Sequence, residues 1–267
     1  TITYDIVKPT ATIVLPIAGL SGVNNLALSS GTATDDIGVS TVKIAIQRQI
    51  NGFWFDGANF TVNQVAPNFL NMTTLSPNAT YWTYTAAAAL NSKLQDNNRY
   101  VFIAQATDLA GNAQSSYLAG TSSITITVDK TNPSASVTAP PTQSGSYIAA
   151  NVGQSGNGTL LHGSNTDANS LASGVKRTQI RLSYLLASDT YYWDGANFSS
   201  TTVNASTAWQ NAGAIWTYTT DINWPTDQSH VMILEARAED NSTLGDGSGS
   251  GNINTPSTAG TDVITFN

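Results

Sequence analysis

Aspartate is the residue type in this 267-residue chain that is best suited to chemistry. The chain has 17 acidic residues, of which Glu235 and Glu239 are the two glutamates, together with two histidines and no cysteine. Without cysteine, thiol nucleophiles, disulfides and cysteine-ligated zinc are excluded. Several aspartate oxygens that converge from separate loops would suit a hard cation such as calcium.

Catalysis by the remaining polar residues is not expected. His162 and His230 fall in different predicted strands, and no nucleophile elbow accompanies either of them. Glu235 and Glu239 lie four residues apart on one predicted strand and therefore on one face, so they cannot flank a sugar bond as a glycosidase requires. We therefore expect the protein not to be an enzyme.

Composition narrows the class of protein further. The net charge is −7 and only 10% of residues are charged, which argues against nucleic acid as a partner because such binding needs a footprint of lysine and arginine. No apolar run approaches the roughly 18 residues of a membrane-spanning helix. These features favour an extracellular or cell-surface protein that does not insert into the membrane through this segment.

The residue pattern predicts an all-β fold. Val42, Ile44 and Ile46 alternate with polar or small residues, as in a strand with one buried face. Asp56-Gly57, between two aromatic-rich runs, predicts a hairpin with a type I′ turn. The one helix candidate is Ala86–Leu94.

The sequence is duplicated. Phe55–Phe60 (FDGANF) returns as Trp193–Phe198 (WDGANF), and Trp82-Thr83-Tyr84 returns as Trp216-Thr217-Tyr218, in the same order. Seven or eight predicted strands in roughly 130 residues are the size of one immunoglobulin-like sandwich. We therefore predict two tandem immunoglobulin-like β-sandwich domains, at residues 5–128 and 129–267.

A strand motif occurs once more than the domains do. Thr1–Asp5 resembles Thr125–Asp129, and the C-terminal residues repeat the same strand with Asn267 in the place of Asp129. We therefore predict that residues 1–4 are an orphan strand. It is either the last strand of a preceding unit in a longer array or a donor strand that pairs with a neighbouring molecule.

Three motifs carry a resemblance to a known family. The linker Val128–Pro133 (VDKTNP), the turn Ala106–Asn112 (ATDLAGN) and the aromatic Asp-Gly hairpin resemble bacterial immunoglobulin-like (Big-type) repeats. The resemblance covers essentially the whole chain. It implies a tandem unit of a secreted or cell-surface protein.

Calcium is the cofactor that this architecture suggests. In an immunoglobulin-like sandwich the incoming linker and two loops meet at one end, an arrangement similar to the junctions of cadherins. The candidate ligands at the two domain junctions are Asp5, Asp35, Asp36, Asp108, Asp129, Asn132, Asp167 and Asp240. The alternative is that these residues only fill turns, whose backbone angles they tolerate. Asp246–Asn252 resembles a calcium loop faintly, and we expect a flexible loop there.

These observations lead to two hypotheses about function. The first is a non-enzymatic structural or adhesive component of a prokaryotic cell surface, such as a stalk, a fibre or a surface-layer subunit, whose partners are neighbouring copies or repeats joined head to tail. The second is a carbohydrate-binding accessory module of a secreted protein, in which Trp209 and Trp224 stack on surface glycans.

Overall fold

The computed structural model describes most of the chain and confirms the prediction of an all-β fold. The described ranges are 4–71, 74–75, 81–84, 87–141, 144–156 and 158–267, so residues 1–3 of the predicted orphan strand lie outside them. Helix α1 (Ala87–Lys93) coincides with the predicted helix. No helix in the described ranges has the length and apolar character needed to cross a membrane.

The chain divides into two compact units. Unit 1 extends to Thr131 and also contains Asn169–Ser173 and Ser242–Ser250. Unit 2 contains Asn132–Ala168, Gly174–Asn241 and Gly251–Asn267. Two short segments of the second sequence repeat therefore belong to unit 1.

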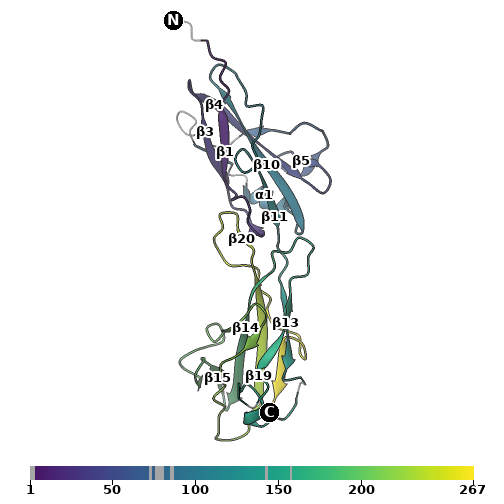
Figure 1. Cartoon of the computed structure of the whole chain (residues 1–267), viewed down its shortest axis with the longest axis vertical. Helices are drawn as coiled ribbons and strands as arrows, with labels where there is room; N and C mark the ends of the chain where they lie inside the picture. The colour runs from purple at the N-terminus through teal and green to yellow at the C-terminus, as the bar shows by residue number, and fades with distance from the viewer. Residues whose placement is uncertain (1–3, 72–73, 76–80, 85–86, 142–143, 157) are drawn as a thin grey trace. The chain divides into compact units, whose positions relative to one another are not determined.

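Unit 1 contains two sheets (Figure 1). In the smaller sheet the order is β1-β3-β9-β8, and in the larger it is β20-β2-β11-β10-β4-β5-β6, with β7 also paired to β4. The strands are β1 (Thr10–Leu15), β2 (Val23–Asn25), β3 (Ser29–Thr34), β4 (Val39–Arg48), β5 (Phe53–Phe55), β6 (Phe60–Val62), β7 (Leu70–Asn71), β8 (Thr74–Leu75), β9 (Tyr81–Tyr84), β10 (Asn98–Asp108), β11 (Ser123–Val128) and β20 (Thr243–Leu244).

The two sheets of unit 1 share one apolar core. Trp82 from the smaller sheet and Ile44 and Phe102 from the larger sheet are fully buried in the same cluster. Alternate residues of β10 are buried, as the period of two in a strand requires. The core therefore fixes which face of each strand points inward. The loops at the strand ends are outside the core, and their side chains are available to bind a ligand.

Strand β20 completes the larger sheet from far along the sequence. Thr243 donates its backbone N–H to Gly22 at 3.0 Å, and Gly245 donates to Asn25 at 2.9 Å, so β20 runs parallel to β2. Gly245 lies so close to Leu26 that a Cβ would stand 2.6 Å from its methyl carbon. The sequence predicts a flexible loop over 246–252, and the structure adds that Ser242–Ser250 belongs to unit 1.

Unit 2 repeats the two-sheet plan (Figure 1). The sheets have the orders β12-β13-β18 and β16-β15-β14-β19-β21, with β17 paired to β14. The elements are β12 (Ser134–Ala139), the 3₁₀ turn η2 (Ala149–Asn151), β13 (Leu161–Thr166), β14 (Val175–Leu186), β15 (Asp189–Trp193), β16 (Phe198–Ser199), β17 (Gln210–Gly213), β18 (Thr217–Tyr218), β19 (Met232–Asp240) and β21 (Val263–Phe266).

A buried tryptophan over a glycine occurs in both units. Trp82 lies against Gly31 in unit 1, and Trp216 lies against Gly163 in unit 2. The two indole N–H groups donate to neighbouring backbone carbonyls, at 3.2 Å to Thr32 and 3.2 Å to Ser136. Because the indole ring occupies the space of a side chain, these two strand positions require glycine.

The predicted hairpin is present, but its turn is not the predicted type. The strands β5 and β6 pair across Asp56–Asn59, and Gly57 has a φ of +102° while Asp56 is not among the residues with positive φ. A type I′ turn needs positive φ at both positions. The Asp56 side chain instead accepts backbone N–H groups two and three residues ahead. Hydrogen bonds from Thr61 and then from these two amides lower the pKa of Asp56 to about 2.

The alignment of the last strands also needs correction. Ala104 donates to Ser122 in unit 1 and Ala236 donates to Asp262 in unit 2, both at 2.9 Å. Because Phe102 pairs with Ile124 and Leu234 pairs with Ile264, β21 corresponds to β11 with a shift of 140 residues. Asn267 therefore corresponds to Thr127, two residues before the predicted counterpart Asp129.

The contact between Gly163 and Trp216 allows the packing of the unit 2 core to be tested. In the Gly163→Ala variant the new Cβ would overlap the carbonyl oxygen of Ser136 and the ring of Trp216. We expect the free energy of unfolding to fall by about 3 kcal/mol, as for overpacked cores, in urea denaturation. Gly156→Ala is the matched control because nothing lies within 4 Å of its added Cβ. Equal effects of the two substitutions would contradict the packing described.

Candidate metal centre

Three aspartates of unit 1 come together from distant parts of the sequence. Asp5 precedes β1, Asp35 follows β3 and Asp108 ends β10. Because β1 and β3 are antiparallel, with Thr10 opposite Thr34, the start of one strand lies beside the end of the other. Asp108 reaches the same end of the unit because it pairs with Val39, four residues beyond Asp35.

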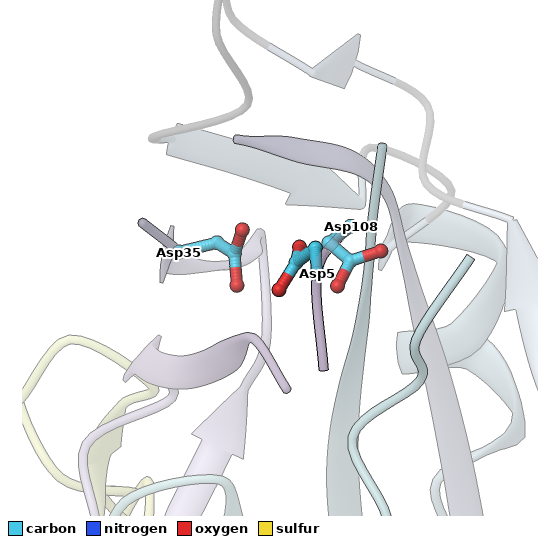
Figure 2. A group of neighbouring side chains, drawn as sticks. All are labelled: Asp5, Asp35 and Asp108. Atoms are coloured by element: carbon cyan, nitrogen blue, oxygen red, sulfur yellow. The ribbon is translucent and has the colours of Figure 1, made fainter. Parts of the chain in front are cut away.

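The three carboxylates face one another (Figure 2). One oxygen from each lies within 4.8 Å of one oxygen from each of the others. Asp108 is 1% exposed, while Asp5 and Asp35 are partly buried. Asp5, Asp35 and Asp108 therefore form a group of converging acidic oxygens, which we call the carboxylate cup.

Hydrogen bonds hold the outer oxygens of the cup. Oδ2 of Asp35 accepts the backbone N–H groups of Ile37 and Gly38, both at 3.0 Å. Oδ1 of Asp5 accepts that of Val7 at 2.9 Å. These short-range bonds hold one oxygen of each carboxylate and leave Oδ2 of Asp5 and Oδ1 of Asp35 outside them.

Asn112 ties the third carboxylate in place. Its backbone N–H donates to Oδ1 of Asp108 and its side-chain amide to Oδ2, both at 2.8 Å. The same amide donates to the carbonyl of Asp5 at 3.2 Å. Asn112 is a positioning residue that the candidate list from the sequence lacks, although the Asp-Leu-Ala-Gly-Asn turn contains it.

Two oxygens of the cup are left without a proton donor. Oδ2 of Asp5 and Oδ1 of Asp35 are buried, and no donor among the described residues bonds to them. A buried polar atom without a partner is costly, so its presence calls for an explanation. A cation that binds in the cup would satisfy both oxygens.

The local charge favours a cation. None of the ion pairs formed by the described residues includes Asp5, Asp35 or Asp108. Burial opposes ionisation of Asp108, but the hydrogen bonds from Asn112 and the loop amides outweigh it and hold the pKa of Asp108 below its ordinary value. The cup therefore contains an ionised carboxylate at neutral pH, which suits a hard cation with oxygen ligands.

Two of the other candidate ligands, Asp36 and Asn132, belong to no group of converging carboxylates among the described residues. Asp36 and Asn132 are exposed, and Asp36 lies outside the group formed by its neighbour Asp35. Asp129 is buried in unit 1, where its Oδ2 accepts the backbone N–H of Ser173 at 2.7 Å. Only three of the predicted ligands in unit 1 therefore face one another in the cup.

Two aspartates of unit 2 repeat the hydrogen bonds of their counterparts. Asp167 accepts the N–H of Gly174 at 2.8 Å, as Asp35 accepts that of Gly38. Asp240 accepts the backbone and side-chain N–H groups of Asn252 at 2.8 Å, as Asp108 does those of Asn112. Both repeats therefore hold these carboxylates with equivalent donors, although the loops that carry the donors are longer in unit 2.

The two candidate sugar-stacking residues have different surroundings. The ring of Trp209 is covered by two guanidinium groups, Arg181 at 4.6 Å and Arg237 at 4.0 Å from the ring centroid. Trp224 is partly buried and lines a cavity of about 180 Å³. Trp224 is thus the residue of the pair that borders a space where a ligand could bind.

Only one of the two histidines lies on a strand, although the sequence predicts a strand at both. His162 is in β13, and His230 precedes β19 with its Nε2 at 2.9 Å from Oδ1 of Asp227. His230 is mostly buried against Tyr184, whose ring centroid is 4.2 Å away. This contact gives His230 a packing role.

Comparison with known proteins leaves the family open. No protein-family model matches the chain, and no curated protein matches it in sequence. The geometry described above is therefore the basis for a functional proposal.

The repulsion among the three carboxylates can be tested without a metal ion. In the presence of a chelator, Asp35→Asn removes one charge but keeps an oxygen that can accept from Ile37 and Gly38. We expect the melting midpoint to rise at low salt and the rise to shrink as salt screens the charges. The matched control is Asp36→Asn, which removes an exposed charge next to it. A midpoint for Asp35→Asn that is lower than, or equal to, that of Asp36→Asn would contradict the electrostatic description.

Proposed function

We propose that the protein is a calcium-stiffened, non-enzymatic structural or adhesive component of a prokaryotic cell surface. In this proposal the two units are immunoglobulin-like repeats of the bacterial Big type, joined head to tail outside the cell. The observation that supports the calcium part most directly is the group of Asp5, Asp35 and Asp108 with its unsatisfied buried oxygens.

The position of the aspartates explains why calcium would stiffen the protein. Asp5 lies on the segment that leads into β1, while Asp35 and Asp108 lie at the ends of two other strands. A bound ion would tie that leading segment to the body of unit 1 through three carboxylates. Calcium accepts six to eight oxygens in flexible geometry, which suits ligands from separate loops.

The rest of unit 1 supports a mechanical role. Its strands are joined into two hydrogen-bonded sheets around one core, and β20, which is distant in the sequence, is paired into the larger sheet. Such a unit resists extension through its strand pairing and needs no substrate cleft. Neighbouring copies or repeats are the partners that this function implies, and nucleic acid is not one of them.

Calcium titration tests the proposal. We expect calcium to raise the melting midpoint of the wild-type chain, because a ligand that binds only the folded state stabilises it by about 2.7 kcal/mol at one hundred times its dissociation constant. The Asp35→Asn variant should lose most of this rise, and Asp36→Asn should keep it. A wild-type midpoint that is the same in calcium and in chelator would overturn the calcium part of the proposal.

Carbohydrate binding is the second candidate function, because Trp224 lines a cavity in unit 2. Its Nε1–H donates to the carbonyl of Val152 at 2.9 Å, which holds the indole in a fixed orientation. In this case a glycan array would show binding that Trp224→Ala removes and Trp209→Ala leaves. An array without any bound glycan would discard this candidate.

A further inference from the structure

The larger sheet of unit 2 has a charged outer face. Along β19, Leu234, Ala236 and Ala238 are buried in the core, so the residues between them point to the opposite face. Strand β14 is paired with β19 (Figure 1) and contributes the neighbouring side chains of that face. We call this face the arginine face, and its residues are Arg177, Gln179, Arg181, Glu235, Arg237 and Glu239.

The equivalent face of unit 1 is almost uncharged. Asp108 pairs with Val39 in unit 1 as Asp240 pairs with Val175 in unit 2, and both pairs lie beside the same irregularity in the strand pairing. The two units are therefore related by 132 residues along β10 and β19, and by 136 along β4 and β14. In unit 1 the six places of the arginine face are held by Thr41, Lys43, Ala45, Ile103, Gln105 and Thr107. Only Lys43 among them is charged, so the fold itself does not require the charges of unit 2.

Both glutamates of the arginine face are already paired. Glu235 receives a bidentate contact from Arg181, whose Nε and Nη2 lie 2.5 and 2.7 Å from the two carboxylate oxygens. Glu239 accepts from Nζ of Lys176 at 3.0 Å and from Nε of Arg177 at 2.7 Å. Burial opposes ionisation of Glu239, but the hydrogen bonds from these two cations outweigh it and hold its pKa below the ordinary value. Each glutamate is therefore held by cations of its own.

Arg237 is the cation of the arginine face that has no carboxylate partner. None of the ion pairs among the described residues includes it. Its Nε and Nη2 both donate to one oxygen, Oε1 of Gln179, at 3.0 and 2.8 Å. Its guanidinium lies 4.0 Å from the ring centroid of Trp209, a cation–π contact that holds it in place. The edge of the guanidinium formed by Nη1 and Nη2 therefore keeps N–H groups that these contacts do not use.

The charge around Arg237 favours an anion. Arg237 is partly buried, and burial, followed by the positive charges of Arg177 and Arg181, lowers its pKa. With Lys176 beside it, the arginine face has four cations and two carboxylates in a chain whose net charge is −7. An anion at the unused guanidinium edge would offset the repulsion among these cations.

The donors around this edge suit an acidic sugar. The fork of a guanidinium binds a carboxylate through two parallel N–H groups, as Arg181 binds Glu235 on the same face. Asn211 is exposed and is paired with Gln179, so an amide side chain lies on the strand beside the site. Amides both donate to and accept from hydroxyl groups. A carboxylate and the hydroxyl groups of one sugar would therefore find matching partners here.

A protein partner fits this face less well. An interface between proteins needs a central apolar patch. The residues of the arginine face are charged or carry an amide. The ring of Trp209 beside them is covered by Arg181 and Arg237 and is not available as an apolar centre.

We propose that the arginine face of unit 2 is a binding site for an acidic sugar, whose carboxylate is bound by the Nη1 and Nη2 edge of Arg237. Trp209 and Gln179 are positioning residues that hold the guanidinium. The site goes beyond the calcium-stiffened structural role. It is also distinct from the cavity beside Trp224, because no residue of the arginine face lines that cavity.

Calorimetric titration of the full chain with polygalacturonate tests the proposal. The titration is done at low salt and in chelator, so that calcium cannot link the polymer to the carboxylate cup. We expect the wild type to bind and Arg237→Gln to bind roughly tenfold more weakly, because a charge-assisted contact is lost. Unit 1 has glutamine in this place, at Gln105. Lys43→Gln is the matched control, since it removes one positive charge from the equivalent face of unit 1, and it should keep the wild-type affinity.

Further arms of the same titration identify the contact and the ligand. Arg237→Lys keeps the charge but not the fork, so it should also bind more weakly than the wild type. Trp224→Ala should bind as the wild type does. Monomeric galacturonate should compete with the polymer, while neutral dextran should not.

Four results would overturn the sugar site. They are a wild type that does not bind polygalacturonate, an equal loss of affinity in Arg237→Gln and Lys43→Gln, a wild-type affinity in Arg237→Lys, or competition by dextran as strong as that by galacturonate. Self-association of the wild type that Arg237→Gln abolishes, without any binding of the polymer, would instead assign the face to a second copy of the chain. Because calcium is absent from these titrations, their failure leaves the calcium proposal to its own test.

Discussion

The close approach of three carboxylates at one end of unit 1 is the main physical constraint in this structure. One oxygen of each carboxylate lies within 4.8 Å of one oxygen of each of the others. Like charges at that separation repel one another, and the repulsion is stronger where the side chains are shielded from water. The surrounding loops stabilise the arrangement with N–H donors from Ile37, Gly38 and Asn112. These donors leave two buried oxygens unsatisfied, and a bound cation would satisfy them and offset the repulsion.

The two-sheet architecture makes this arrangement possible. The antiparallel pairing of β1 with β3 and of β10 with β4 brings residues from positions 5, 35 and 108 to one end of the unit. The core fixes the register of these strands, because a slip of one residue would turn Trp82 or Phe102 out of the apolar cluster. The site thus depends on packing that lies well away from it.

Much of the fold could be predicted because the decisive signals are local. Alternation in β4, the Asp-Gly pair at Asp56 and the alanine-rich run of α1 each determine a short element through nearby residues. The duplicated order of landmarks then predicts two units. The part of the site that could be predicted, Asp5 with Asp35 and Asp108, follows from the same repeated positions.

What escaped prediction depends on contacts between distant residues. The sequence does not show which of Asp35 and Asp36 joins the carboxylate group. The backbone turn decides this, because it partly buries Asp35 and exposes Asp36. Strand β20 forms because Gly245 fits against Leu26, more than two hundred residues away in sequence. The guanidinium groups over Trp209 and the two-residue shift of β21 are likewise set by pairing across the sheet.

A high-resolution crystal structure of the chain grown with calcium would test the central claim most directly. We expect an ion bound by Asp5 Oδ2, Asp35 Oδ1 and an oxygen of Asp108, at about 2.3–2.6 Å and with six to eight oxygen ligands in all. A structure in which the cup holds no ion at millimolar calcium, with the carboxylates placed as they are now, would contradict it.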